Sequence, residues 1–211
     1  MKWGIILGVL GALTLMGCTV PDASSAAVAA PFTVSDYFVP SGYEGDASVL
    51  GVDPKAIVVD YSCKPRPAGA HGVCYRYTYT PVPVAEKGVG WGGVEWQSPA
   101  DNWGQDQPQP VTPNATHVSF YAGADSDGEA VQFLVGGLSA TDPDGAPLPY
   151  ADQIKATLSA TLTTELTRYD IALPTGANYN YVVGAFGFSI EASGGTPQTL
   201  YLDDIRWLPA N

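Results

Sequence analysis

Apolar and polar residues alternate in short runs along most of the chain beyond residue 31. These runs fall at residues 57–61, 73–79, 118–120, 131–135, 169–173 and 182–190. Alternation with a period of two predicts β-strands, because successive side chains of a strand point to opposite faces of its sheet. Glycine, proline, aspartate and asparagine separate the runs, and 24 glycines and 18 prolines leave little room for long helices. The pattern predicts an all-β sandwich or barrel.

Residues 151–173 form a segment that fits two periods. Ile154, Leu158 and Leu162 recur at every fourth position, as they would on a helix. The same segment also alternates apolar and polar residues and is rich in threonine, which favours strands. We interpret it as two strands joined by a turn near Thr164.

The last predicted strand carries two carboxylates among large apolar side chains. Alternation places one face at Tyr201, Asp203, Ile205 and Trp207, and the other at Leu200, Leu202, Asp204 and Arg206. A carboxylate at a buried strand position is costly unless it is paired, hydrogen-bonded or bound to a metal. The pattern therefore predicts a partner for at least one of Asp203 and Asp204, either a cation or a cluster of backbone amides.

The first residues of the chain form a targeting segment, in which Lys2 precedes an apolar run. The run is too short to span a bilayer comfortably, which needs about 20 residues. It ends in Leu-Met-Gly-Cys at residues 15–18, which resembles a bacterial lipobox. The resemblance implies a lipoprotein signal peptide over residues 1–17, cleavage before Cys18, and lipid attached to that cysteine.

The residue after the cysteine bears on the location of the protein. Thr19 stands there instead of an aspartate, which resembles the outer-membrane address of bacterial lipoproteins. We therefore expect a lipid-anchored protein of the bacterial cell envelope, in the outer membrane. The alternative is an ordinary secretory signal that is cut after Ala27 or Ala30.

Composition divides the rest of the chain into two parts. Residues 18–31 are small, polar and rich in alanine, which is typical of a flexible tether. No second linker or internal repeat follows, so residues 32–211 are expected to form one domain.

The formal net charge of −12 at pH 7 repels phosphate backbones and anionic headgroups. Nucleic acid is thereby excluded as a partner, and the lipid anchor is the expected contact with the membrane.

Two cysteines remain once Cys18 is assigned to lipid. Cys63 and Cys74 have only each other to pair with, and an exported protein meets an oxidising compartment. The prolines and glycines between them are typical of a turn, so we predict a disulfide that ties the ends of a hairpin. The alternative is a metal site with the nearby His71, which falls one ligand short of a closed zinc shell.

A glycine-rich stretch in the middle of the chain holds three of the five tryptophans. Trp91 and Trp96 flank a short strand-like run, and Trp103 follows from a turn. Aromatic rings beside the amides of Asn102 and Gln105 suit a sugar, whose ring offers an apolar face and a hydroxyl edge. The alternative for Trp91 and Trp96 is packing in the core, because tryptophans bury a large area wherever they lie.

The end of the chain resembles a known fold family. Residues 200–206, Leu-Tyr-Leu-Asp-Asp-Ile-Arg, resemble the final strand of the galactose-binding-like jelly rolls common among bacterial carbohydrate-binding modules. The resemblance implies a single jelly-roll β-sandwich. It also implies a structural calcium ion held by a carboxylate of this strand and a partner near the start of the domain. The candidate ligands are Asp203, Asp204, Glu44 and Asp46.

Residues suited to catalysis are scarce. The two histidines, His71 and His117, are isolated in sequence, and no nucleophile or zinc-protease motif occurs. Glu95 is the best candidate for a glycosidase carboxylate, but no second carboxylate lies on its predicted strand. We predict a non-catalytic, lipid-anchored protein that binds a neutral carbohydrate through an aromatic surface including Trp103. The alternatives are a structural or protein-interaction lipoprotein without a sugar ligand, and a glycoside hydrolase.

Overall fold

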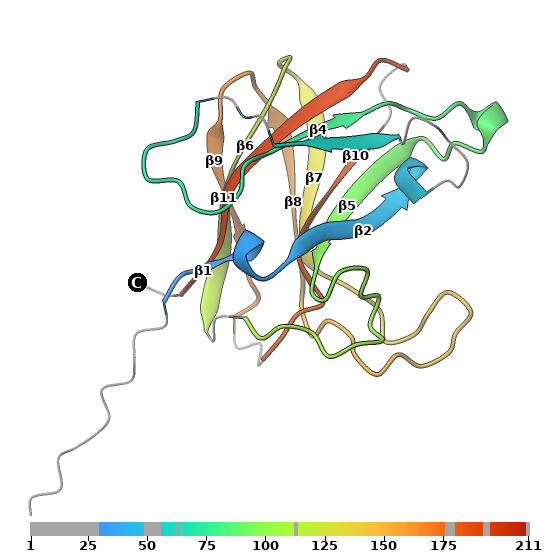
Figure 1. Ribbon diagram of the computed structural model, residues 1–211, viewed down its shortest axis with the longest axis vertical. Coiled ribbons are helices and arrows are strands. Elements are labelled where there is room, and N and C mark those ends of the chain that lie inside the picture. Colours follow the sequence, from blue (N-terminus) through green and yellow to red (C-terminus); the bar gives the residue numbers. More distant parts are fainter. Residues whose placement is uncertain are drawn as a thin grey trace, which may run out of the picture.

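Two antiparallel sheets face each other as a sandwich (Figure 1). The computed structural model describes residues 30–48, 56–61, 63, 65–111, 114–175, 180–191 and 195–209. The six-stranded sheet has the order β3-β4-β11-β6-β9, with β1 paired to β11, and the five-stranded sheet has the order β2-β5-β10-β7-β8. The predicted signal peptide, most of the predicted tether and Cys18 lie outside the described residues.

The described elements are short strands joined by loops and single turns. The six-stranded sheet contains β1 (Phe32–Thr33), β3 (Ile57–Asp60), β4 (Tyr75–Tyr79), β6 (Ala115–Ala124), β9 (Thr167–Ala172) and β11 (Gln198–Pro209). The five-stranded sheet contains β2 (Val39–Gly45), β5 (Trp91–Gln97), β7 (Glu129–Gly136), β8 (Lys155–Leu162) and β10 (Gly184–Glu191). Short 3-10 turns occur at η1 (Val34–Asp36), η2 (Asp46–Ser48) and η3 (Val84–Glu86). Within the described part, no helix is long and apolar enough to cross a membrane.

Aromatic side chains from both sheets fill the space between them. Trp96 of β5 is fully buried, and its ring meets Tyr77 of β4 edge-on, with centroids 5.7 Å apart. Phe120 of β6 and Phe133 of β7 also meet edge-on, at 4.6 Å. Because burial of large apolar rings is a dominant favourable term in folding, this core stabilises the sandwich.

The segment with two periodicities forms two strands, as predicted. β8 belongs to the five-stranded sheet and β9 to the six-stranded sheet, and residues 163–166 connect them. Along β8, Leu158 packs against the core, while its neighbours Thr157 and Ser159 are exposed. The threonine-rich positions are therefore the outward face of an edge strand.

The last strand contains a β-bulge that its sequence pattern does not reveal. The register of β11 against β6 shifts between Asp203 and Arg206, and Asp204 has a φ of 53°. An extra residue in one strand inverts the alternation of its side chains. Leu202 before the bulge and Trp207 after it therefore both face the core, so the predicted division of this strand into two faces is wrong.

Candidate functional site

The outer face of the five-stranded sheet has a floor of small residues. β5 turns Trp96 into the core, which leaves the alternate positions of the strand to the outer face. There, Gly93 pairs with Ser189 of β10, and Glu95 pairs with Gly187 of β10. Because glycine carries no side chain, neighbouring side chains can pack directly on the backbone of the sheet at these positions.

The side chains of Trp91 and Glu95 occupy the space that the glycines leave. A Cβ atom at Gly93 would meet Cζ3 of Trp91 at 3.4 Å, and one at Gly187 would meet Cγ of Glu95 at 3.2 Å. On β2, a Cβ atom at Gly45 would be only 2.8 Å from Cδ2 of Trp91. The glycine-rich stretch around Trp91 thus allows the indole ring to rest on the sheet.

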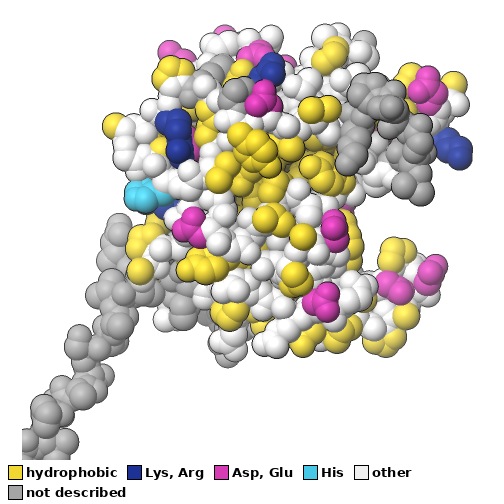
Figure 2. All heavy atoms as spheres, viewed as in Figure 1, with side chains coloured by type: hydrophobic (Ala, Val, Ile, Leu, Met, Phe, Trp, Pro, Cys, Tyr) yellow, Lys and Arg dark blue, Asp and Glu magenta, His cyan; other side chains and the backbone are white. Residues whose placement is uncertain are grey.

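A hollow of about 620 Å³ opens over this floor. Side chains from all five strands line it: Glu44, Trp91, Glu95, Gln132, Leu134, Lys155, Thr157, Ser189 and Glu191. In Figure 2 the outline of the molecule is indented on the right, between the projecting segment around η3 and the loop that follows β7. An aromatic ring and hydroxyl, amide and carboxyl groups therefore face one space.

Two further hollows share lining residues with the first one. One, of about 510 Å³, shares Glu44 with it and is lined by Trp103 and Gln105. The other, of about 370 Å³, shares Gln132 and reaches β8. We term the three together the outer-face groove, which runs from Trp103 to β8. Five strands about 4.8 Å apart span about 19 Å, so the groove suits an extended ligand.

Three of the predicted carbohydrate-binding residues lie along this groove. Trp91 and Trp103 are each partly exposed, in adjoining hollows, and Gln105 beside Trp103 is exposed. The structure thus places Trp91, from a strand, and Trp103, from a separate loop, in two hollows that share Glu44. A solvent-facing indole ring can stack on an apolar surface of a ligand.

Trp96 and Asn102, also predicted to bind carbohydrate, lie away from solvent. Trp96 is fully buried in the core, and Asn102 is 1% exposed within its loop. Oδ1 of Asn102 accepts the backbone N–H of Gly104 at 2.9 Å, and its Nδ2 donates to the carbonyl of Asp106 at 3.0 Å. An asparagine that bonds neighbouring backbone groups shapes a turn. For Trp96 the alternative of packing in the core is confirmed, and for Asn102 the predicted contact with carbohydrate is wrong, because Asn102 instead holds the loop that presents Trp103.

Glu95, which the sequence analysis named as the best candidate for a glycosidase carboxylate, is a buried residue at the bottom of the first hollow. It is 9% exposed, and burial raises its pKa to about 8, with Glu44 and Asp152 adding to the rise. Gln97 and Lys155 act in the opposite direction. A carboxyl with such a pKa holds its proton at neutral pH, so it can donate a hydrogen bond as well as accept one.

Asp152 is a site residue that sequence reasoning missed. It lies just before β8, and its carboxylate accepts the backbone N–H groups of Val183 at 2.6 Å and Leu138 at 3.1 Å. Desolvation raises its pKa, while these backbone bonds act to lower it. Asp152 ties the loop after β7 to the start of β10. No local pattern reveals this role, because its partners are 14 and 31 residues away.

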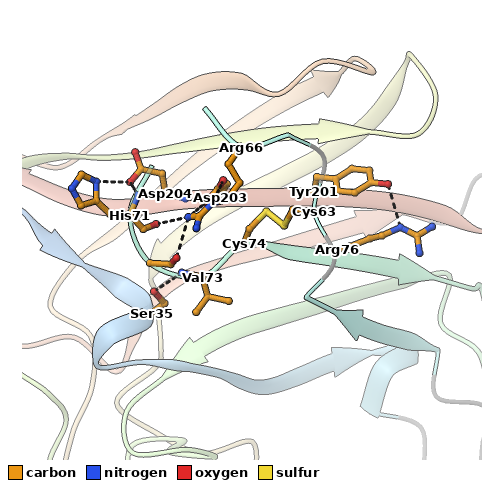
Figure 3. Close-up of a disulfide and its surroundings, with 11 residues drawn as sticks. Ser35, Cys63, Arg66, His71, Val73, Cys74, Arg76, Tyr201, Asp203 and Asp204 are labelled. Atoms are coloured by element: carbon orange, nitrogen blue, oxygen red, sulfur yellow. Dashed lines mark hydrogen bonds and ion pairs between the residues drawn. A yellow bond between two sulfur atoms is a disulfide. The ribbon is translucent and has the colours of Figure 1, made fainter. Parts of the chain in front are cut away.

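The partner required by the carboxylates of the last strand is an arginine. Asp203 is fully buried, and its two oxygens accept hydrogen bonds from Nε and Nη2 of Arg66 at 2.8 and 2.6 Å (Figure 3). Asp204 accepts the backbone N–H of His71 at 2.8 Å and pairs with Arg206 at 2.9 Å. A bidentate guanidinium is a strong partner for a carboxylate. The prediction that a cation or backbone amide meets these groups is confirmed.

The other two carboxylates predicted to bind calcium belong to different surroundings. Asp46 accepts a hydrogen bond from the hydroxyl of Tyr79 at 2.8 Å and from the backbone N–H of Val89 at 2.6 Å. Glu44 lines the outer-face groove. The described residues contain no group of three or more His, Cys, Asp or Glu side chains that could hold a metal ion. Calcium stays a prediction, and Arg66 supplies the cation that motivated it.

Cys63 and Cys74 form the predicted disulfide (Figure 3). Arg66 lies in the loop that the bridge closes, and its Nη2 donates to the backbone carbonyls of His71 and Gly72 at 3.0 Å each. The same guanidinium binds β11 through its carboxylate partner, so the loop is held against the six-stranded sheet. Because the two sulfurs are bonded to each other, they are not available as thiolate ligands, and the alternative of a metal site on these cysteines is wrong.

Comparisons with known proteins bear on the fold. No protein-family model matches the chain, and no curated protein matches its sequence. Among solved structures, a family 30 carbohydrate-binding module is 16% identical, with a TM-score of 0.50 over 86% of this chain and 99% of that module. A family 30 module from a cellulosomal cellulase of Clostridium thermocellum is 17% identical, with a TM-score of 0.49 over 86% and 99%. The first likeness confirms the predicted jelly-roll β-sandwich.

Proposed function

We propose that this is a non-catalytic carbohydrate-binding protein whose outer-face groove takes an extended glycan. The observation that carries the proposal is the partly exposed ring of Trp91, which rests on a glycine floor among hydroxyl, amide and carboxyl groups. A sugar offers an apolar face to such a ring and a hydroxyl edge to such polar neighbours. A solved structure that shares the fold is a carbohydrate-binding module, which supports binding over catalysis.

The charges of the groove favour a neutral glycan. Two further carboxyl groups, Glu44 and Glu191, line the first hollow beside the protonated Glu95, whereas Lys155 is the one basic side chain in its lining. An anionic glycan would be repelled by this excess of negative charge and by the net charge of −12 on the whole chain. A neutral glycan meets no such penalty and can use the polar groups as hydrogen-bond partners.

Trp91→Ala is expected to lower the affinity for a neutral glycan about tenfold. Stacking on the ring contributes about 1 kcal/mol beyond the burial of its area, and tenfold corresponds to about 1.4 kcal/mol. Trp103→Ala should act in the same direction, because Trp103 lines the adjoining hollow. The measurement is a glycan array of neutral plant, fungal and bacterial oligosaccharides, followed by calorimetry with an oligosaccharide that binds.

Tyr37→Ala is the matched control for these two variants. Tyr37 is 53% exposed but does not line the outer-face groove, so its loss should leave the affinity unchanged. Full binding by both tryptophan variants would move the site elsewhere on the molecule. A folded wild-type protein that binds no glycan on the array would instead favour the structural or protein-interaction role.

The proposed lipid anchor rests on Cys18 and the lipobox-like sequence before it, and the proposed location in the outer membrane of a bacterial cell envelope rests on Thr19 after it. Cys18→Ala is expected to release the protein from membranes, because the thiol that accepts the lipid is then absent. Cell fractionation and incorporation of labelled palmitate would measure the change. A variant that stays with the membrane fraction would show that the anchor lies elsewhere.

A further inference from the structure

Glu95 has charged neighbours on several of the elements packed around it. The charged groups in its surroundings are Glu44 from β2, Asp152 from the segment before β8, Lys155 from β8, and Glu191 from β10. β7 contributes only uncharged residues to the same hollow, namely Gln132, Leu134 and Gly136. Acidic groups thus outnumber the one ammonium, in a place where the carboxyl of Glu95 is nearly removed from water.

Glu95 and Asp152 approach the same small space, which exists because residue 184 is a glycine. A Cβ atom at Gly184 would lie 3.3 Å from Oε2 of Glu95 and 3.7 Å from Oδ2 of Asp152. Asp152 accepts the backbone N–H groups of Val183 at 2.6 Å, Leu138 at 3.1 Å and Gly184 at 3.4 Å, which favours its ionised form. Burial raises the pKa of both carboxyl groups, but the backbone donors act against the rise at Asp152, whereas the negative charge of Asp152 adds to the rise at Glu95, so we assign the proton to Glu95.

We propose that Glu95 binds the glycan in its protonated form, with its carboxyl O–H donating a hydrogen bond to a sugar oxygen. This inference rests on the proposed function and adds to it a dependence on pH. A protonated carboxyl has one donor, whereas an ionised carboxylate has only acceptors. Loss of the proton therefore removes the donor and leaves a desolvated charge beneath the sugar.

The pH range of the effect follows from the surroundings of the carboxyl. Burial, first, and the neighbouring Glu44 and Asp152, second, raise the pKa of Glu95 to about 8. The proton is present at pH 6 and largely lost at pH 9.5. The affinity of the wild-type protein should fall about 30-fold between these values, because the protonated fraction falls about tenfold for each pH unit above the pKa.

The test compares three proteins on the array of neutral oligosaccharides, read at pH 6 and pH 9.5. Glu95→Gln carries an amide N–H donor that does not titrate, so its affinity should be the same at both pH values. Glu165→Gln is the matched control, because Glu165 is exposed and lines none of the three hollows of the groove. It should keep the wild-type fall. Near-ultraviolet circular dichroism at each pH confirms that the proteins are folded.

Equal wild-type affinity at both pH values would overturn this inference alone, as would an equal fall in Glu95→Gln. An absence of binding at pH 6 by folded wild-type protein would overturn the proposed function, and the inference with it. A readout without glycan is the carboxyl carbon resonance of Glu95, followed by NMR as pH is raised. A titration midpoint near 8 would support the inference, and a midpoint below 6 would overturn it.

Discussion

Trp96→Ala is expected to destabilise the domain by about 3–5 kcal/mol, the range for truncation of a buried large aromatic side chain. The indole ring is fully buried and lies edge-on to Tyr75, Tyr77 and Phe186, at centroid distances of 5.2, 5.7 and 5.3 Å. Removing it leaves a cavity among rings from both sheets, which cannot close without disturbing them. Equilibrium unfolding in urea, followed by tryptophan fluorescence or circular dichroism, measures the loss.

Trp91→Ala is the matched variant on the other face of the same strand. Trp91 is partly exposed and rests on the outer face, so its truncation should cost far less stability than that of Trp96. The two variants thus separate the functions of the two rings, with one expected to lose stability and the other to lose binding. A loss below about 1 kcal/mol for Trp96→Ala would contradict the assignment of this ring to the core.

At alkaline pH the Glu95→Gln variant should have a higher free energy of unfolding than the wild type. Below about pH 4.5 the difference between the two proteins should no longer change with pH. The pKa of Glu95 is raised from about 4.5 to about 8 on folding, so the folded state keeps a proton that the unfolded state loses. The contribution of the protonated carboxyl to stability is complete below pH 4.5 and is lost as pH rises towards 8. A shift of about 3.5 units corresponds to about 4–5 kcal/mol at pH 9, which the glutamine variant avoids.

The measurement is urea unfolding of wild type and Glu95→Gln at intervals from pH 4 to pH 9. The difference in unfolding free energy between the two proteins should grow in favour of the variant as pH rises. Glu191→Gln serves as the exposed control and should follow the wild-type dependence on pH. Parallel curves for wild type and Glu95→Gln would show that the carboxyl is ionised in the folded protein at neutral pH.

Most of the strands could be predicted from the sequence because one face of each packs in the core, whereas β1 and β2 were not among the predicted runs. Period-two alternation survives even in β8, where the same residues also fit a helix, because its threonines face solvent and its apolar residues face the core. The bulge in β11 could not be predicted from the sequence, because it depends on the register of this strand against β6. A local pattern assumes an unbroken strand, and one extra residue after Asp203 inverts every later position.

The candidate site could be predicted from the sequence only in part. Trp91 and Trp96 are five residues apart on one strand, and an odd spacing places them on opposite faces. The odd spacing is a signal that one ring binds and the other packs in the core, although we predicted the same role for both. Only the pairing of β5 with its neighbours decides which ring faces the core. Glu44 and Asp152 reach Glu95 from segments far away in the chain, and Arg66 reaches Asp203 across 137 residues. Contacts of this kind follow from topology and leave no local pattern.

The central claim is that a glycan occupies the outer-face groove, and the indole N–H signals of the protein test it most directly. The measurement is a two-dimensional NMR titration with a neutral oligosaccharide that binds on the array. We expect the indole signals of Trp91 and Trp103 to shift, and those of the fully buried Trp96 and Trp207 to stay in place. Binding that leaves the signals of Trp91 and Trp103 unmoved would contradict the claim.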